Sequence, residues 1–157
     1  MKKYPLAVTL NAIFHENKIL LIHRVKAPYK NYWTMPGGKI ELGEHIDESA
    51  VRECHEETGL FVTFEKIVGI TNEVIHEQGK IKSHYLLFVC KLRASTTDFV
   101  ESKEGKLCWY PLTHLPEKMP AADKEMIKRY LLRDNTITVH KLKTKQKGNE
   151  YFVEEFI

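Results

Sequence analysis

The stretch GKIELGEHIDESAVRECHEETGL, from Gly38 to Leu60, decides how this chain is interpreted. It brings four carboxylates together at short spacings, namely Glu44, Glu53, Glu56 and Glu57. Carboxylates held close together repel one another, and this repulsion destabilises a fold unless cations lie among them. The stretch therefore predicts a divalent metal site, and such a metal site predicts a phosphorylated substrate.

A helix is expected from Glu44 to Thr58, because this segment contains no Gly or Pro and Gly59 follows as a helix C-cap. At about 100° per residue, one helix face presents three carboxylates together, those of Glu53, Glu56 and Glu57. The residues expected to pack inward from the adjoining face are Ala50, Val51 and Cys54. Before the helix, Pro36-Gly37-Gly38 predicts a tight loop whose backbone approaches a ligand or metal closely.

Magnesium fits this pattern of side chains best. It takes oxygen ligands, keeps several waters and is commonly shared with substrate phosphates, so a loop carbonyl and two or three glutamates suit it. The alternative is a solvated acidic helix face. So many fixed residue types at fixed spacings disfavour that alternative.

The same stretch resembles the Nudix box, G-x5-E-x7-R-E-U-x-E-E-x-G-U, in which U is a bulky apolar residue. The matching positions are Gly38, Glu44, Arg52, Glu53, Glu56, Glu57, Gly59 and Leu60. Cys54 departs from the pattern, because it is smaller than the usual Leu, Ile or Val. The resemblance implies the Nudix α/β/α sandwich and hydrolysis of a nucleoside diphosphate linked to another moiety, with Mg²⁺ or substituting Mn²⁺ as cofactor.

The resemblance also implies a role for each box residue. Glu53 is the expected general base or base-positioning group, and it acts together with Arg52 and Glu56. Arg52 is expected to orient carboxylates through a bidentate pair. Glu44 has two possible roles, as a metal ligand or as a brace for the helix start. The expected metal ligands are the carbonyl of Gly38 (or that of Gly37) and the carboxylates of Glu53, Glu56, Glu57 and Glu104.

Residues outside the box extend the expected site. Glu104 is included because MutT-like hydrolases carry a distant glutamate in a similar KEG context before a tryptophan, and Glu101 is the competing candidate. Arg24 ends an expected strand, and Lys39 follows the glycine loop. Both are candidates for binding substrate phosphates, and the alternative for each is an ordinary surface cation.

Base recognition is expected near the C-terminal helix. Leu115 to Asp123 resembles the segment before the final helix in MutT-like purine triphosphate hydrolases, where a short polar side chain reads the base edge. Asp123 occupies that position, and helix N-capping is the alternative role. Phe14, Trp33 and Tyr85 are candidates for stacking on the base, or else ordinary core aromatics.

Two absences bear on the substrate. ADP-ribose hydrolases of this family carry a marker proline downstream of the box, but no proline occurs from Phe61 to Tyr110. Dinucleoside polyphosphate hydrolases carry a marker tyrosine, and Tyr85 lies too far along to supply it. We therefore expect a MutT-like hydrolase that converts a nucleoside triphosphate to monophosphate and pyrophosphate, with 8-oxo-dGTP the leading candidate. The alternatives are RNA 5′-pyrophosphohydrolysis and a regulator that binds nucleotide without cleaving it.

Length and composition fit this interpretation. The 157 residues, of which 43% are hydrophobic, suit one domain spanning 1–157. The formal net charge of +3 is too small to indicate nucleic acid by itself. No apolar run is long enough for a membrane span, and the N-terminus lacks a signal-peptide pattern, so we expect a cytoplasmic protein without membrane contact. The odd number of cysteines predicts free thiols, at Cys54, Cys90 and Cys108.

Apolar periodicity predicts a mixed α/β sandwich. The expected strands are Leu6 to Phe14, Ile19 to His23, Trp33 to Met35, Phe61 to Ile70 with Val74-Ile75 in a following strand, Tyr85 to Leu92, and Lys106 to Tyr110. Tyr85 to Leu92 is expected to be central, because it is apolar on both faces. Ala121 to Leu132 has apolar residues at helical spacing and is expected to form a second helix.

The tail, from about residue 134 to 157, is expected to form a β-hairpin. Thr136 to Leu142 and Glu150 to Phe156 are its strands, around a Lys-rich turn that contains Gly148-Asn149. The alternating lysines, at positions 141, 143, 145 and 147, indicate a protected edge strand. Alternatively they grip phosphate or RNA, or the hairpin extends the sheet or forms a homodimer interface.

Overall fold

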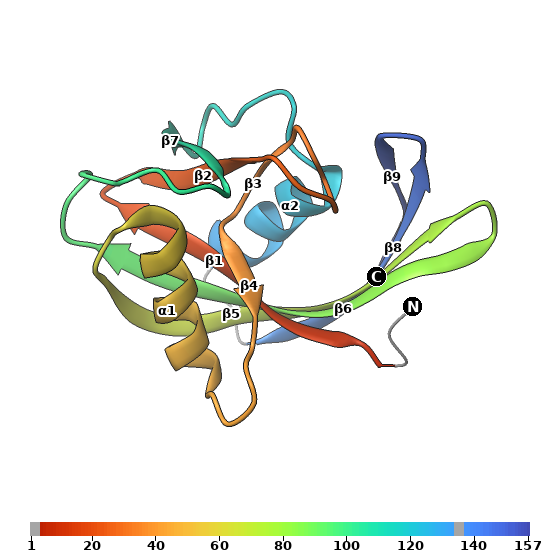
Figure 1. The fold of residues 1–157 in the computed structure, drawn as a ribbon, viewed down its shortest axis with the longest axis horizontal. Coiled ribbons are helices and arrows are strands. Elements are labelled where there is room, and N and C mark those ends of the chain that lie inside the picture. Colours follow the sequence, from red (N-terminus) through yellow and green to blue (C-terminus); the bar gives the residue numbers. More distant parts are fainter. Residues whose placement is uncertain (1–3, 134–136) are drawn as a thin grey trace.

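The computed structural model describes residues 4–133 and 137–157, which form a curved mixed sheet with helices on both faces (Figure 1). The elements are β1 (Leu6–His15), β2 (Lys18–Arg24), β3 (Trp33–Thr34), β4 (Gly37–Lys39), α1 (Ile46–Thr58), β5 (Val62–Glu77), β6 (Lys80–Ala94), β7 (Gly105–Pro111), α2 (Ala121–Met126), the π-helical turn η1 (Ile127–Leu131), β8 (Thr138–Lys147) and β9 (Glu150–Phe156). Within these residues, no helix is both long and apolar enough to span a bilayer.

The strands follow the order β3-β2-β1-β6-β5-β8-β9, with β4 paired to β1 and β7 paired to β2. β1 pairs with β6 in parallel, β5 pairs with β8 in parallel, and the other pairs are antiparallel. The predicted α/β/α sandwich with a mixed sheet is confirmed. The predicted central position of the Tyr85–Leu92 segment is also confirmed, because β6 lies between β1 and β5.

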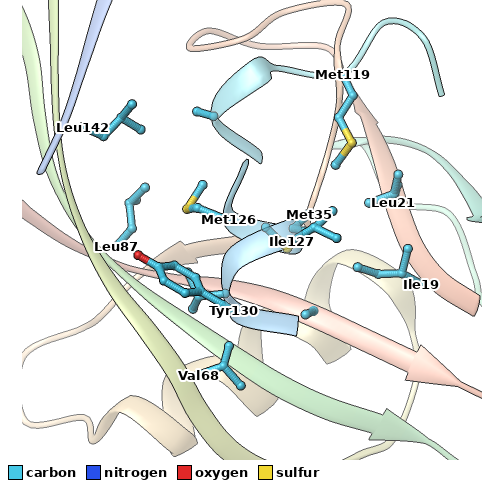
Figure 2. Close-up of a cluster of buried hydrophobic side chains, with 13 residues drawn as sticks. Ile19, Leu21, Met35, Val68, Leu87, Met119, Met126, Ile127, Tyr130 and Leu142 are labelled. Atoms are coloured by element: carbon cyan, nitrogen blue, oxygen red, sulfur yellow. The ribbon is translucent and has the colours of Figure 1, made fainter. Parts of the chain in front are cut away.

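Alternating side chains build a core on each face of the sheet. In β2, Ile19 and Leu21 join the core beneath α2 and η1, whereas Leu20 and Ile22 join the core beneath α1. Figure 2 shows the first of these cores, in which Tyr130 and its helical neighbours lie over the sheet. The two cores fix α1 and α2 against opposite faces of the same strands.

The helix α1 begins at Ile46, so the predicted start at Glu44 is wrong. Glu44 closes a turn instead, because its backbone N–H donates to Glu41 O at 3.1 Å and its carboxylate accepts from Glu41 N–H at 2.9 Å. The predicted C-cap is confirmed: Gly59 adopts a left-handed φ of 68°, and its N–H donates to His55 O. The expected burial of Val51 is wrong, since this residue is 36% exposed beside the buried stripe of the helix.

The glycine segment before α1 is a short strand rather than the predicted tight loop. β4 pairs antiparallel with β1, and Thr9 is the partner of Gly38. A Cβ on Gly37 would lie 2.0 Å from Thr9 O, and a Cβ on Gly38 would lie 2.3 Å from the Glu53 carboxylate. The first glycine therefore permits strand pairing, and the second leaves room for an acidic side chain of α1.

Three other boundaries differ from expectation. β5 runs without a break from Val62 to Glu77, and its pairing with β6 stays in continuous register from Gly69 to Ile75, where an interruption was expected after Ile70. The expected single helix from Ala121 divides into α2 and the π-turn η1. β8 extends to Lys147, so the lysine-rich segment is strand and only the turn at Gly148-Asn149 follows it.

The C-terminal hairpin joins the protein's own sheet. β8 lies between β5 and β9, so β9 rather than the lysine-rich strand forms the edge, contrary to expectation. Figure 1 shows this hairpin beside the long β5–β6 hairpin, on the side of the molecule away from α1. Thr136 and the side chain of Lys141 lie outside the described residues. The hairpin places β8 side chains next to β5.

Candidate functional site

A cavity of about 680 Å³ opens among β1, β4, α1, β5, β6, α2 and the loops that follow β2 and precede β7. Glu44 does not line this cavity, but nine other box and flanking residues expected in the site do: Arg24, Gly38, Lys39, Arg52, Glu53, Glu56, Glu57, Glu104 and Asp123. The fold thus brings together residues that are up to 99 positions apart in sequence, from Arg24 to Asp123.

Arg52 organises the carboxylates at one end of this site. Its guanidinium donates to both oxygens of Glu44, from Nε at 2.7 Å and from Nη2 at 3.0 Å. Nη1 donates to Glu53 at 2.8 Å and to Glu56 at 3.3 Å, and Nη2 also donates to Lys39 O. The expected bidentate pair is therefore present on Glu44, and the hydrogen bonds from Arg52 lower the pKa of that carboxyl to about 2. In this arrangement Glu44 braces the helix start.

The box glutamates occupy different environments although they come from one helix. Glu56 is 58% exposed in its side chain, whereas Glu57 is only 7% exposed. Glu57 accepts a hydrogen bond from Gly37 N–H at 3.0 Å. Burial, together with the nearby carboxylates of Glu53 and Glu104, nevertheless raises the pKa of Glu57 to about 8. Burial also raises the pKa of Glu53, although Arg52 opposes that shift.

Glu104, rather than its competitor Glu101, lies in the cavity. Glu104 pairs with Lys26 at 3.1 Å and lies close enough to Glu57 to raise the pKa of that residue. Glu101 accepts a hydrogen bond from Leu107 N–H at 3.0 Å, which fixes the start of β7. Glu101 is therefore used in the loop itself, and Glu104 is available to a ligand.

The two cations expected to bind phosphate differ in how they are held. Arg24 is half-buried and donates from Nε to Pro28 O at 2.8 Å. Its charge partly opposes the rise in the pKa values of both Glu57 and Asp123. Arg24 therefore lies between the box end of the cavity and the α2 end. Lys39 is exposed at the cavity rim, and its carbonyl is engaged by Arg52.

Asp123 is not the N-cap of α2. Pro120 holds that position, and the Asp123 carboxylate turns instead to accept from Met35 N–H at 3.1 Å. Asp123 is 4% exposed, and burial raises its pKa to about 7, with a smaller contribution from the charge of Glu73. This buried carboxyl lines the cavity at the α2 end.

Glu73 is a cavity residue that the sequence did not single out. It is 3% exposed on β5, and its Oε1 accepts hydrogen bonds from the hydroxyls of Tyr29 and Thr144. Burial raises the pKa of Glu73 above the ordinary range, while both hydroxyl donors oppose that shift. The sequence feature that could have identified Glu73 is an acidic residue on the buried face of a strand, between Thr71 and Ile75.

Of the three aromatic candidates for base stacking, Tyr85 lines the cavity. Trp33 packs edge-to-face against Tyr110 with ring centroids 5.4 Å apart, and Phe14 packs against the α2-side core beneath Lys91. Trp33 and Phe14 thus serve the core, which was the alternative role considered for them.

Two tail lysines, Lys143 and Lys147, face solvent beside acidic residues of β9. Lys143 pairs with Glu154 at 3.4 Å and has Glu155 as its strand partner on β9. Lys147 has Glu150 opposite it. These neighbouring carboxylates weaken the field that an RNA phosphate would meet.

The donor set at the box end fits a hard divalent cation. Among the described residues, no group of three or more Asp, Glu, His or Cys side chains is already arranged to hold a metal ion. Magnesium does not require such a cage, because it is commonly held by one or two carboxylates together with waters and substrate phosphates. Burial, with help from the acidic neighbours, raises the pKa of the Glu57 carboxyl, and a nearby cation would return such a group to the ionised form.

Comparison with known proteins gives a consistent answer. A family model described as the NUDIX domain matches residues 3–130. The uncharacterized Nudix hydrolase YvcI of Bacillus subtilis is 32% identical over 120 residues, which cover 76% of this chain and 73% of YvcI. An ADP-ribose pyrophosphatase of Methanocaldococcus jannaschii is 31% identical over 137 residues, covering 83% of this chain and 79% of that protein. The crystal structure of a MutT protein from Bacillus halodurans superposes with a TM-score of 0.78 at 30% identity, covering 97% of this chain and 96% of that one.

Proposed function

Because the NUDIX domain matches most of its length, the chain belongs to the NUDIX family of hydrolases, which act on nucleoside-diphosphate-linked substrates, and we propose that it cleaves a nucleoside triphosphate to monophosphate and pyrophosphate. The observation that carries the proposal is a single cavity with the box carboxylates at one end and the buried Asp123 at the other. Arg24 lies between these ends, where a triphosphate would join its base-bearing sugar.

The metal ligands proposed are the Gly38 carbonyl together with Glu53, Glu56, Glu57 and Glu104. Bound Mg²⁺, or Mn²⁺ in its place, would neutralise phosphate charge and lower the pKa of a water. Glu53 accepts the proton of the attacking water, since it is half-buried and its pKa is raised. Arg52 is a positioning residue that holds Glu53 and Glu56 in place. Arg24 and Lys39 bind phosphate oxygens.

Asp123 is proposed to recognise the base edge, because it is buried at the cavity and does not cap its helix. An oxidised purine nucleotide such as 8-oxo-dGTP is the leading substrate. ADP-ribose is the main competitor, since a relative of M. jannaschii carries that name. The missing marker proline between Phe61 and Tyr110 favours the triphosphate.

A nucleotide panel tests the proposal. Purified protein is assayed with Mg²⁺ and with Mn²⁺ against 8-oxo-dGTP, dGTP, dATP, ADP-ribose and triphosphorylated RNA, and products are separated by chromatography. We expect monophosphate and pyrophosphate from a purine triphosphate. Faster turnover of ADP-ribose or RNA would replace the proposed substrate, and nucleotide binding without any product would indicate a regulator.

Glu53→Gln tests the assigned base. Turnover should fall about 10²-fold or more while nucleotide binding persists. The matched control is Glu65→Gln, on an exposed part of β5 where Glu65 pairs with Lys91 and Arg93. Unchanged turnover in the Glu53 variant would remove this residue from the role.

A further inference from the structure

We propose that Glu73 is a second base-recognising residue, positioned by the C-terminal hairpin, and that it selects purines presenting adjacent N–H donors, as guanine does. This inference rests on the proposed function, because it takes the α2 end of the cavity as the base site. It adds a residue from β5 and a structural element, β8–β9, that lies beyond the residues matched by the NUDIX domain.

The Glu73 carboxyl is anchored through one oxygen only. Oε1 accepts from the Tyr29 hydroxyl and, at 3.2 Å, from Thr144 Oγ1. Across residues 4–133 and 137–157, no protein donor reaches Oε2, although Glu73 is 3% exposed and lines the cavity. This oxygen is left to the cavity that Glu73 lines, so a ligand N–H that reached Oε2 would make a hydrogen bond that no described protein donor supplies.

Asp123 repeats this arrangement on the neighbouring element. Its Oδ2 accepts from Met35 N–H, and no described donor reaches Oδ1. Asp123 and Glu73 lie close enough for their charges to interact, and both line the cavity. The cavity therefore offers one oxygen of each carboxyl, Glu73 Oε2 and Asp123 Oδ1, as a hydrogen-bond acceptor in the ionised form. Guanine presents N1–H and a 2-amino group side by side, whereas adenine places the N1 lone pair beside its amino group.

The partners of Glu73 show which element holds it. Thr144 belongs to β8, which pairs in parallel with β5, and Glu73 is the strand partner of Leu142. Tyr29 has a φ of 61°, a left-handed conformation that bulky residues rarely adopt. Its ring packs on Tyr151 of β9 with centroids 4.3 Å apart. The C-terminal hairpin thus fixes both hydroxyls that orient Glu73.

The isosteric variant Glu73→Gln gives a directional test. Tyr29 and Thr144 both donate to Oε1, so the amide oxygen must occupy that position and the amide nitrogen must face the cavity. A donor then replaces an acceptor, which disfavours guanine and favours adenine. Binding of dGMP and of dAMP is measured by titration calorimetry without metal. The wild-type protein should prefer dGMP, and the variant should lose about tenfold or more of that preference.

The matched control is Glu77→Gln, on the same strand but paired with Lys82 outside the cavity, and it should retain the wild-type preference. If Glu73→Gln does not fold, Thr144→Val replaces it. That variant removes one of the two anchors and should weaken dGMP binding by about threefold while changing dAMP binding less. A lower melting temperature with an unchanged dGMP/dAMP ratio would overturn the inference, because it indicates a structural role only.

The same measurements separate this inference from the proposed function. Selective dGMP binding that depends on Glu73, in a protein that cleaves no triphosphate, would refute the proposed reaction and support the inference. Triphosphate cleavage with the same guanine-to-adenine ratio in wild type and Glu73→Gln would refute the inference alone. Equal wild-type affinity for dGMP and dAMP would also refute it.

Discussion

Asp123 makes the stability of this protein depend on pH in a way that Asp123→Asn should remove. Burial raises the pKa of Asp123 from 3.8 to about 7, in spite of the hydrogen bond from Met35 N–H. The folded state therefore holds this proton more tightly than the unfolded state does. The resulting stability is fully present below the unfolded pKa of 3.8, and it is lost as pH rises through about 7.

The size of the effect follows from the two pKa values. One pKa unit corresponds to about 1.4 kcal/mol, so the change from 3.8 to about 7 is worth about 4 kcal/mol. About 3 kcal/mol of this falls between pH 5 and pH 8. An asparagine amide does not titrate, and its oxygen can still accept from Met35 N–H. The variant should therefore gain about 3 kcal/mol relative to wild type across that range.

The assay is urea unfolding at several pH values from 5 to 8, followed by tryptophan fluorescence, with the free energy of unfolding extrapolated to water. Asp98→Asn, on an exposed loop, is the matched control and should follow the wild-type profile. The quantity of interest is the difference between Asp123→Asn and wild type at each pH. A difference that stays constant from pH 5 to pH 8 would refute the reasoning.

Two further predictions concern the box. A Cβ on Gly38 would lie 2.3 Å from the Glu53 carboxylate, so Gly38→Ala should lower turnover about 10²-fold with little change in melting temperature. A Cβ on Gly37 would instead meet Thr9 O, so Gly37→Ala should lower the free energy of unfolding by about 2 kcal/mol or more. Equal effects of both on melting would contradict this. Arg52 opposes the rise that burial causes in the pKa of Glu53, so Arg52→Gln should move the acidic limb of the kcat/KM profile to higher pH. An unmoved limb would exclude this positioning role.

Local patterns explain why the sequence predicted most elements and the box end of the site. The continuous apolar run from Ile19 to Ile22 indicates a strand packed on both faces, and Gly59 marks the end of α1. Boundaries were missed where tertiary contacts override such patterns. The glycine pair at Gly37 and Gly38 predicts a loop when only the local sequence is considered, but pairing with β1 makes this segment a strand.

The α2 end of the site was harder to predict, because its contacts join distant segments. Thr144 and Glu73 are 71 residues apart, and they meet only because β8 pairs in parallel with β5. Tyr29 is 44 residues from Glu73 and reaches it from the loop after β2. An acidic residue in an apolar strand pattern indicates burial, but sequence spacing does not specify which hydroxyls satisfy it.

The two ends of the cavity differ in how their acidic groups are stabilised, and this difference assigns the parts of a substrate to them. At the box end, Arg52 supplies positive charge to Glu44 and Glu53. Glu57 at this end is also buried and accepts from a backbone N–H, but Glu53 and Glu104 lie near it, so several acidic groups gather where a cation and a phosphate chain can bind. At the other end, Glu73 and Asp123 are held by neutral hydroxyl and backbone donors in a buried setting. Neutral N–H donors, rather than a metal ion, suit these two carboxyls, so the base belongs there and the diphosphate belongs at the box.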